Sequence, residues 1–158
     1  MSQTPQNEKK SRFQLSREVQ EEFVNGIAQT MLSLAENAEQ GQPSVAETPF
    51  CPVTGKEYSG ANMVRLALTA MEKGYADNRW LPFKQLQAVR EEHPDLNIRI
   101  RKGEHGVTVL RPEDVFFTVE KEGKWNFVSE EQAKGLPDVR RHTLLYPFTV
   151  FNSAQIEN

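Results

Sequence analysis

The sequence predicts an α+β fold, in which N-terminal helices pack on an antiparallel β-sheet with hairpins. Two observations support this prediction: apolar residues recur every three or four positions before residue 92, and from residue 97 onward they alternate with polar residues. The expected organisation is a disordered arm over residues 1–13, then a single domain over residues 14–158. The helices of this domain lie within residues 14–92 and its sheet within residues 97–152.

Three helices are expected in the N-terminal part of the chain. The first spans about residues 16–39, and Ser16 is a candidate N-cap because it precedes a run of regularly spaced apolar residues. The second spans residues 60–73 and follows Ser59, which again has a side chain suited to an N-cap. The third spans about residues 82–92, since proline is well tolerated at the first helical position.

Period-two alternation indicates strands in the C-terminal part of the chain. One hairpin is expected over residues 98–111, with its connection at residues 102–106, where two glycines permit a tight turn. A second hairpin is expected around the turn Glu122-Gly123. The stretch 129–142 is interpreted as a loop with one helical turn, and the β-prone run 144–151 predicts a last strand.

The distribution of charge limits the class of partner. The net charge is −3 over 158 residues, but residues 79–111 carry seven Lys or Arg against four Asp or Glu. A local basic segment can attract phosphate even within an acidic chain. The single cysteine, Cys51, cannot form an internal disulfide, and the sequence shows neither a signal peptide nor a membrane span. We therefore expect a cytoplasmic protein.

The sequence contains no recognisable catalytic or cofactor motif. His93, His105 and His142 are far apart and Cys51 has no partner cysteine, so no metal site is expected. Gly-rich phosphate loops and the G-x-S-x-G pattern of a nucleophile elbow are also missing. We therefore expect a binding protein with no cofactor and no catalytic activity of its own. A Cys51–His dyad or a concealed pair of carboxylates is the alternative.

The basic segment interleaves cations with aromatic residues, as in Arg79-Trp80 and Phe83-Lys84. Proteins that bind single strands combine a positive groove with aromatic platforms, and each stacked base contributes about 1–3 kcal/mol. The loop at residues 102–106 adds a cation together with glycines that allow close approach of a backbone.

These features also have a purely structural interpretation. Trp80 can belong to the core, and the loop 102–106 can be only a hairpin connection. Arg99 and Arg101 can form a solvated strand face. The residues alone leave both interpretations open.

Five motifs occur in the order found in a known family. They are Tyr58-Ser59-Gly60-Ala61-Asn62, Lys73-Gly74-Tyr75, Arg79-Trp80-Leu81-Pro82-Phe83-Lys84-Gln85, Arg101-Lys102-Gly103-Glu104-His105-Gly106, and Tyr146-Pro147-Phe148-Thr149-Val150-Phe151-Asn152 with Gln155. Over residues 48–156 the chain resembles the N-terminal domain of ArdC-type antirestriction proteins, and this module is similar to the N-terminal part of plasmid TraC-type primases. The resemblance implies a single-stranded DNA-binding domain from a conjugative plasmid or mobile element that shields incoming DNA from host restriction.

The resemblance implies a nucleic-acid-binding site of ten residues: Tyr58, Asn62, Trp80, Lys84, Gln85, Arg101, Lys102, His105, Asn152 and Gln155. The lysines would contact phosphates, and Trp80 and Tyr58 would stack on bases or shape the groove. The amide side chains would hydrogen-bond sugars, bases or neighbouring loops, or would act as structural caps.

Two departures from the family pattern are visible. Pro82 stands where the family usually has threonine, and His105 stands where it often has lysine. The H-E-x-x-H helix of the family's metallopeptidase-like domain is not in this sequence, so the peptidase activity is not carried over.

Two other functions stay open. The chain could be a protein-interaction module that inhibits a restriction endonuclease directly, although a charge of −3 is small for a DNA mimic. It could also be the accessory N-terminal domain of a primase or metallopeptidase, with the catalytic domain on its C-terminal side.

Overall fold

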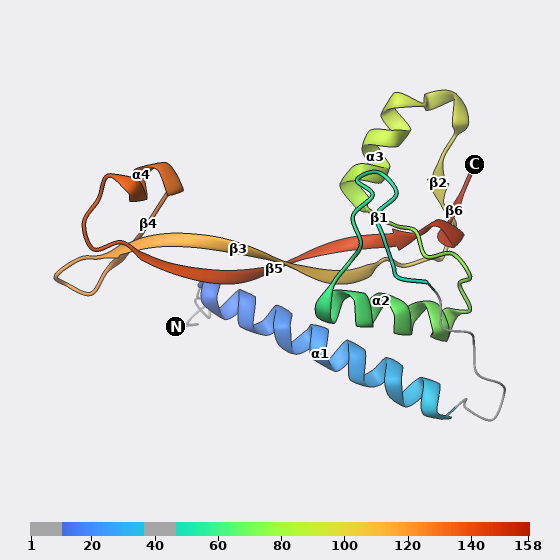
Figure 1. The fold of residues 1–158 in the computed structure, drawn as a ribbon, viewed down its shortest axis with the longest axis horizontal. Coiled ribbons are helices and arrows are strands. Elements are labelled where there is room, and N and C mark those ends of the chain that lie inside the picture. Colours follow the sequence, from blue (N-terminus) through green and yellow to red (C-terminus); the bar gives the residue numbers. More distant parts are fainter. Residues whose placement is uncertain (1–10, 37–46) are drawn as a thin grey trace, which may run out of the picture. The chain divides into compact units, whose positions relative to one another are not determined.

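The computed structural model describes residues 11–36 and 47–158 (Figure 1). Its helices and antiparallel strands confirm the predicted α+β class. In chain order the elements are α1 (Arg12–Glu36), α2 (Gly60–Lys73), β1 (Trp80–Pro82), α3 (Phe83–Glu92), η2 (Pro94–Leu96), β2 (Arg99–Ile100), β3 (Val107–Val119), β4 (Trp125–Val128), α4 (Glu130–Lys134), β5 (Arg140–Asn152), η3 (Ser153–Gln155) and β6 (Ile156–Glu157), where η denotes a 3₁₀ helix.

The chain divides into two compact units. Unit 1 comprises Met1–Glu21, of which residues 11–21 are described, and Arg111–Tyr146, whereas unit 2 comprises Glu22–Leu110 and Pro147–Asn158. The boundaries fall within α1, β3 and β5, so these three elements contribute residues to both units. No helix among the described residues is long and apolar enough to cross a bilayer.

The start of α1 differs from the prediction. The helix begins at Arg12, so Arg12 and Phe13 are helical and do not belong to an arm; the rest of the predicted arm, residues 1–10, lies outside the described residues. Ser11 Oγ accepts a hydrogen bond from Gln14 N at 3.2 Å, which is the expected capping contact. Ser16 is instead buried within the helix, where its Oγ accepts a hydrogen bond from Leu145 N at 3.0 Å.

Helices α2 and α3 lie close to their predicted positions. Ser59 precedes α2 as its N-cap residue, although its side chain makes no capping hydrogen bond. Gly74 ends α2 at φ 73°, and its N–H donates to Ala70 O, which is a common helix termination for glycine. Helix α3 begins at Phe83, one residue later than predicted, because Pro82 belongs to β1 and is the N-cap residue.

Within unit 2, Arg65 of α2 lies against α1. Its Nη1 donates a hydrogen bond to Phe23 O at 3.0 Å, and the guanidinium lies 5.2 Å from the centre of the Phe23 ring. A Cβ at Gly26 would overlap Arg65 Nη1, so glycine at this position permits the contact. Burial lowers the pKa of the Arg65 side chain.

The strands form a four-stranded sheet with the order β1-β5-β3-β4 and a separate two-stranded sheet of β2 and β6. The predicted hairpin over residues 98–111 is therefore wrong. Strand β2 pairs with β6, which places Arg99 opposite Glu157 and Ile100 opposite Ile156. Strand β3 pairs with β4 and β5, and it continues through Pro112, past the predicted end of the hairpin at residue 111.

The second predicted hairpin is confirmed. Strands β3 and β4 pair in antiparallel register from Phe116 opposite Val128 to Val119 opposite Trp125. Gly123 lies in the connecting turn at φ 80°. The predicted helical turn follows as α4, and β5 extends the predicted last strand in both directions.

The core of unit 2 forms where α2 packs on the ends of β1, β3 and β5. Its fully buried members are Leu66, Ala70, Trp80, Val109 and Val150. Short β1 pairs with the C-terminal end of β5, so that Trp80 lies opposite Asn152 in the ladder. This pairing brings two of the sequence motifs, residues 79–85 and 146–152, side by side in unit 2.

Candidate nucleic-acid interface

All ten predicted site residues belong to unit 2, where they separate into two groups by exposure. Four are exposed at the surface: Lys84, Arg101, Lys102 and His105. Six are buried or half-buried: Tyr58, Asn62, Trp80, Gln85, Asn152 and Gln155. The second group makes hydrogen bonds and packing contacts within the protein that support the exposed group.

Trp80 belongs to the core and is not a stacking platform. Its side chain has 0% exposure and packs in the cluster of Leu66, Val109 and Val150, with the Tyr75 ring at 6.1 Å. A base cannot stack on a ring that has no accessible face, so the predicted stacking role of Trp80 is wrong.

Tyr58 and Gln85 also have internal partners. Tyr58 Oη donates a hydrogen bond to Trp80 O at 3.0 Å, and burial, with a smaller effect of Cys51, raises the pKa of this hydroxyl above its usual value. The buried Cys51 thiol donates to Gln85 Oε1 at 2.9 Å. These contacts join the loop before α2 to β1 and α3.

Asn62 ties α2 to β3 through two hydrogen bonds with one backbone residue. Its Nδ2 donates to Leu110 O at 2.6 Å, and its Oδ1 accepts from Leu110 N at 2.9 Å. The side-chain amide thus pairs with the strand as a neighbouring backbone would. Both polar atoms are engaged, which supports the structural interpretation of Asn62.

Asn152 and Gln155 form a reciprocal cap on η3. Asn152 Oδ1 accepts from Ala154 N at 2.9 Å, Gln155 Oε1 accepts from Asn152 N at 2.9 Å, and Asn152 Nδ2 donates to Asp77 O at 2.8 Å. The exposures of the two side chains are 0% and 2%. Neither side chain presents a free surface to a ligand.

Gln155 fixes the loop that carries the exposed cations. Its Nε2 donates to His105 O at 2.7 Å and to Glu104 Oε2 at 3.1 Å. Arg101 N donates to Gln155 O at 2.9 Å, so the loop is held on both sides of Lys102. The buried amide therefore positions a loop that is itself at the surface.

The two glycines of this loop have different functions. Gly103 has φ 86° and open space around its Cβ position, so it is required by the backbone conformation of the turn. Gly106 lies against β5, where an added Cβ would overlap Thr149 Cγ2 and lie 2.9 Å from Phe151 Cζ. Its close approach is to the protein's own strand rather than to a bound phosphate.

We expect Gly106→Ala to destabilise the protein by about 1–3 kcal/mol, because the added methyl group overpacks the contact with Thr149. Combining it with Thr149→Ser, which removes Cγ2, should recover part of the loss. Urea unfolding of the four proteins in this cycle measures the coupling. Strictly additive changes in the free energy of unfolding would contradict the proposed overlap.

A pocket of about 380 Å³ adjoins the loop. Its lining includes Thr69, Lys73, Tyr75, residues 103–107 and Gln155. Tyr75 Oη donates to Glu104 Oε2 at 3.5 Å, and burial together with the Glu104 carboxylate raises the pKa of Tyr75.

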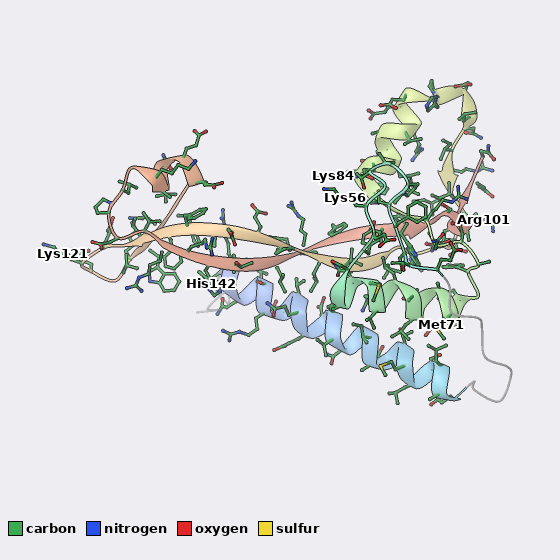
Figure 2. All side chains as sticks on the ribbon, in the orientation of Figure 1. Lys56, Met71, Lys84, Arg101, Lys121 and His142 are labelled. Carbon is green, nitrogen blue, oxygen red and sulfur yellow. The ribbon has the colours of Figure 1, made fainter. Side chains whose placement is uncertain are left out.

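One further exposed cation, Lys56, was not predicted. Its carbonyl oxygen accepts a hydrogen bond from Cys51 N at 2.9 Å, and the Cys51 side chain contacts Gln85, next to Lys84 in sequence. Figure 2 shows Lys56, Lys84 and Arg101 at the surface. The sequence could have predicted this exposed cation, because Lys56 directly follows the turn-forming residues Pro52-Val53-Thr54-Gly55.

Four arginines of the basic segment have carboxylate partners. Arg79 Nη2 contacts Asp77 Oδ2 at 2.6 Å, and this hydrogen bond holds the pKa of Asp77 below its usual value. Arg99 Nε contacts Glu157 Oε1 at 2.7 Å, Arg101 Nε lies 3.9 Å from the same carboxylate, and Arg111 Nη2 lies 3.5 Å from Glu113 Oε2. Lys84, Arg90 and Lys102 carry the other positive charges of the segment. Among the described residues, no three His, Cys, Asp or Glu side chains gather to hold a metal ion.

The fold and the site define an α+β module in which a buried hydrogen-bond network supports a basic surface. The sequence model described as the N-terminal domain of anti-restriction factor ArdC (ArdcN) matches residues 14–151. The chain belongs to this family.

Individual relatives agree with this assignment. The crystal structure of the antirestriction ArdC protein from the R388 plasmid, in its metal-free form, aligns with a TM-score of 0.51 and 27% identity over 92% of this chain. Two proteins named DNA primase TraC from Escherichia coli are 34% and 31% identical, each over 75% of this chain. The chain covers 42% of the ArdC structure and 8% and 10% of the two primases.

Proposed function

We propose that this chain binds single-stranded DNA through the basic surface of unit 2, and that binding in the cytoplasm protects incoming plasmid DNA from restriction. The observation that carries the proposal is the loop 101–106, which exposes Lys102 and His105 while buried Gln155 fixes its backbone. The antirestriction name of the family and the DNA-directed activity named for the two primases support it.

The chemistry of the surface suits a phosphate backbone. Lys102 and His105 are exposed on a loop that internal hydrogen bonds already order, so little conformational entropy is lost when a phosphate binds. Lys84 and Lys56 are further exposed cations of unit 2, and both lie near Gln85 in sequence or through Cys51. Lysine contacts to phosphate give affinity without sequence preference, as a protein that protects any incoming strand requires.

Binding of labelled single-stranded and duplex oligonucleotides across a salt series tests the proposal. We expect tighter binding of the single strand, with log K falling linearly as log salt rises. Lys102→Ala should reduce the slope by about 0.7 for the lost phosphate contact. Lys134→Ala is the matched control, because it removes the same charge from exposed α4 in unit 1.

Two outcomes would contradict the proposal. Absence of binding, or binding whose affinity does not depend on salt, would exclude a phosphate-contacting surface. If the wild type and Lys102→Ala have equal slopes of log K against log salt, this loop does not contact the phosphates. Co-precipitation with a restriction endonuclease in the absence of DNA would instead favour direct inhibition of the enzyme.

A further inference from the structure

Unit 1 carries a cluster of five aromatic side chains that the proposed interface does not use. We call it the aromatic patch: Phe13, Phe117, Trp125, Phe127 and His142. The rings come from the first turn of α1, from the β3–β4 hairpin and from β5. Phe117 is almost fully buried, whereas the exposures of Trp125 and Phe127 are 50% and 42%. A cluster of partly exposed aromatic rings is a candidate for an interaction surface.

The geometry of the patch leaves one face of the Trp125 indole open. The Phe117 ring stacks on Trp125 at 4.9 Å with an interplanar angle of 16°, so it covers one face. Phe13 is perpendicular to both rings, 5.2 Å from Trp125 and 6.0 Å from Phe117. A ring on the second face of the indole would be much farther from Phe117, so Phe13 lies beside the stack. No aromatic ring of the patch therefore covers the second face, and the exposure of Trp125 is 50%.

Charged side chains of both signs lie near the patch. Arg12 and Phe127 line one pocket together with Glu113, Asp114 and Glu130. The Arg12 guanidinium lies 4.7 Å from the centre of the Phe127 ring, a cation–π arrangement. Arg141 Nη1 lies 3.8 Å from Asp114 Oδ2, so its charge is partly shared. Lys121 lies at the tip of the same hairpin (Figure 2).

We propose that the aromatic patch is a second contact for single-stranded DNA, in which an unpaired base stacks on the open face of Trp125 while neighbouring cations contact its phosphates. An accessible aromatic face with flanking cations is the combination by which proteins hold single strands without reading their sequence. A duplex keeps its bases stacked on one another, so the same face selects unpaired DNA. This inference rests on the proposed DNA binding, but it concerns a different surface and a different unit.

The two tryptophans of the chain provide a direct readout, because Trp80 is fully buried and Trp125 is half exposed. We expect oligo(dT) to quench intrinsic fluorescence in the wild type and to leave it unchanged in Trp125→Phe, whose remaining tryptophan is Trp80. Trp125→Ala should weaken binding of labelled oligo(dT) by about 5- to 150-fold. Trp125→Phe, which retains a ring, should weaken it less. Leu136→Ala, a truncation of another exposed apolar side chain in unit 1, is the control.

The outcomes separate this inference from the proposed function. Salt-dependent binding that requires Lys102, without quenching and without an effect of Trp125→Ala, overturns the inference and leaves the proposed function intact. Quenching in the wild type supports the inference even if Trp125→Ala fails to fold. A patch that mediates self-association would show a Trp125-dependent change in oligomeric state with unaltered DNA affinity, and this result overturns the inference. Absence of any DNA binding overturns both.

Discussion

Replacing Trp80 with alanine is expected to lower the free energy of unfolding by about 3–5 kcal/mol, the range observed for truncation of a buried aromatic side chain. Trp80 is fully enclosed by α2, β3 and β5, and its backbone lies in the β1–β5 ladder. The substitution leaves a cavity where three elements meet, so the surrounding structure can relax only partly. Thermal and urea unfolding measure the loss.

Two further substitutions test this explanation. Trp80→Phe should cost less, because it keeps a ring and removes Nε1, which has no hydrogen-bond partner among the described residues. Val53→Ala, at a side chain with 53% exposure, should change stability by less than about 0.5 kcal/mol. If Trp80→Ala kept full stability but abolished DNA binding, the residue would have the stacking role that its burial argues against.

Asn152→Ala should have the next largest effect on stability. The substitution removes the acceptor for Ala154 N and the donor to Asp77 O at a site with no exposure to solvent. Each buried backbone group left without a partner costs about 1–3 kcal/mol, so we expect a loss of at least about 2 kcal/mol. Because Asn152 stands beside Gln155 in the reciprocal cap, the loop that carries Lys102 should also lose order.

The measurement must separate stability from DNA contact. Asn126→Ala, which removes a hydrogen bond to exposed Glu120, is the control and should cost less than 1 kcal/mol. At a temperature where Asn152→Ala remains folded, loss of order in the loop that carries Lys102 should reduce the salt slope of DNA binding by at most about 0.7, the value for one phosphate contact. A lower affinity with an unchanged slope would instead show that the neutral Asn152 side chain contacts the nucleic acid itself.

Local sequence signals predicted the helices well and the strand partners poorly. Gly74 ended α2 at the predicted position because a glycine at a helix end has a specific local function. The partner of Arg99 was wrong because alternation identifies a strand but not the strand beside it. Residues 156–157, which supply that partner, are too short to give a periodic signal of their own.

The sequence motifs did not distinguish exposed residues from buried ones. A cation in one motif and an amide in another were predicted to share a site, but they have different surroundings in the structure. Lys102 is exposed, whereas Gln155 is enclosed and holds the loop. Burial depends on the whole packing arrangement, so it could not be inferred from the motif alone.

The aromatic patch was not predicted for a related reason. Trp125 and Phe127 alternate correctly for a strand with one buried face, and such a pattern indicates a core. The half exposure of Trp125 follows from the small number of elements that cover this hairpin, which no local pattern shows.

The division of the chain has a consequence for how this family can vary. The chain of unit 2 runs up to Leu110 and resumes at Pro147, on either side of the unit 1 segment Arg111–Tyr146. The two crossings between the units lie in β3 and β5, which are neighbours in the sheet. The segment is thus placed as an insertion within unit 2. A change in the length of this segment would leave the Trp80 core and the Gln155 network of unit 2 uninterrupted, so the two proposed contact surfaces could change separately.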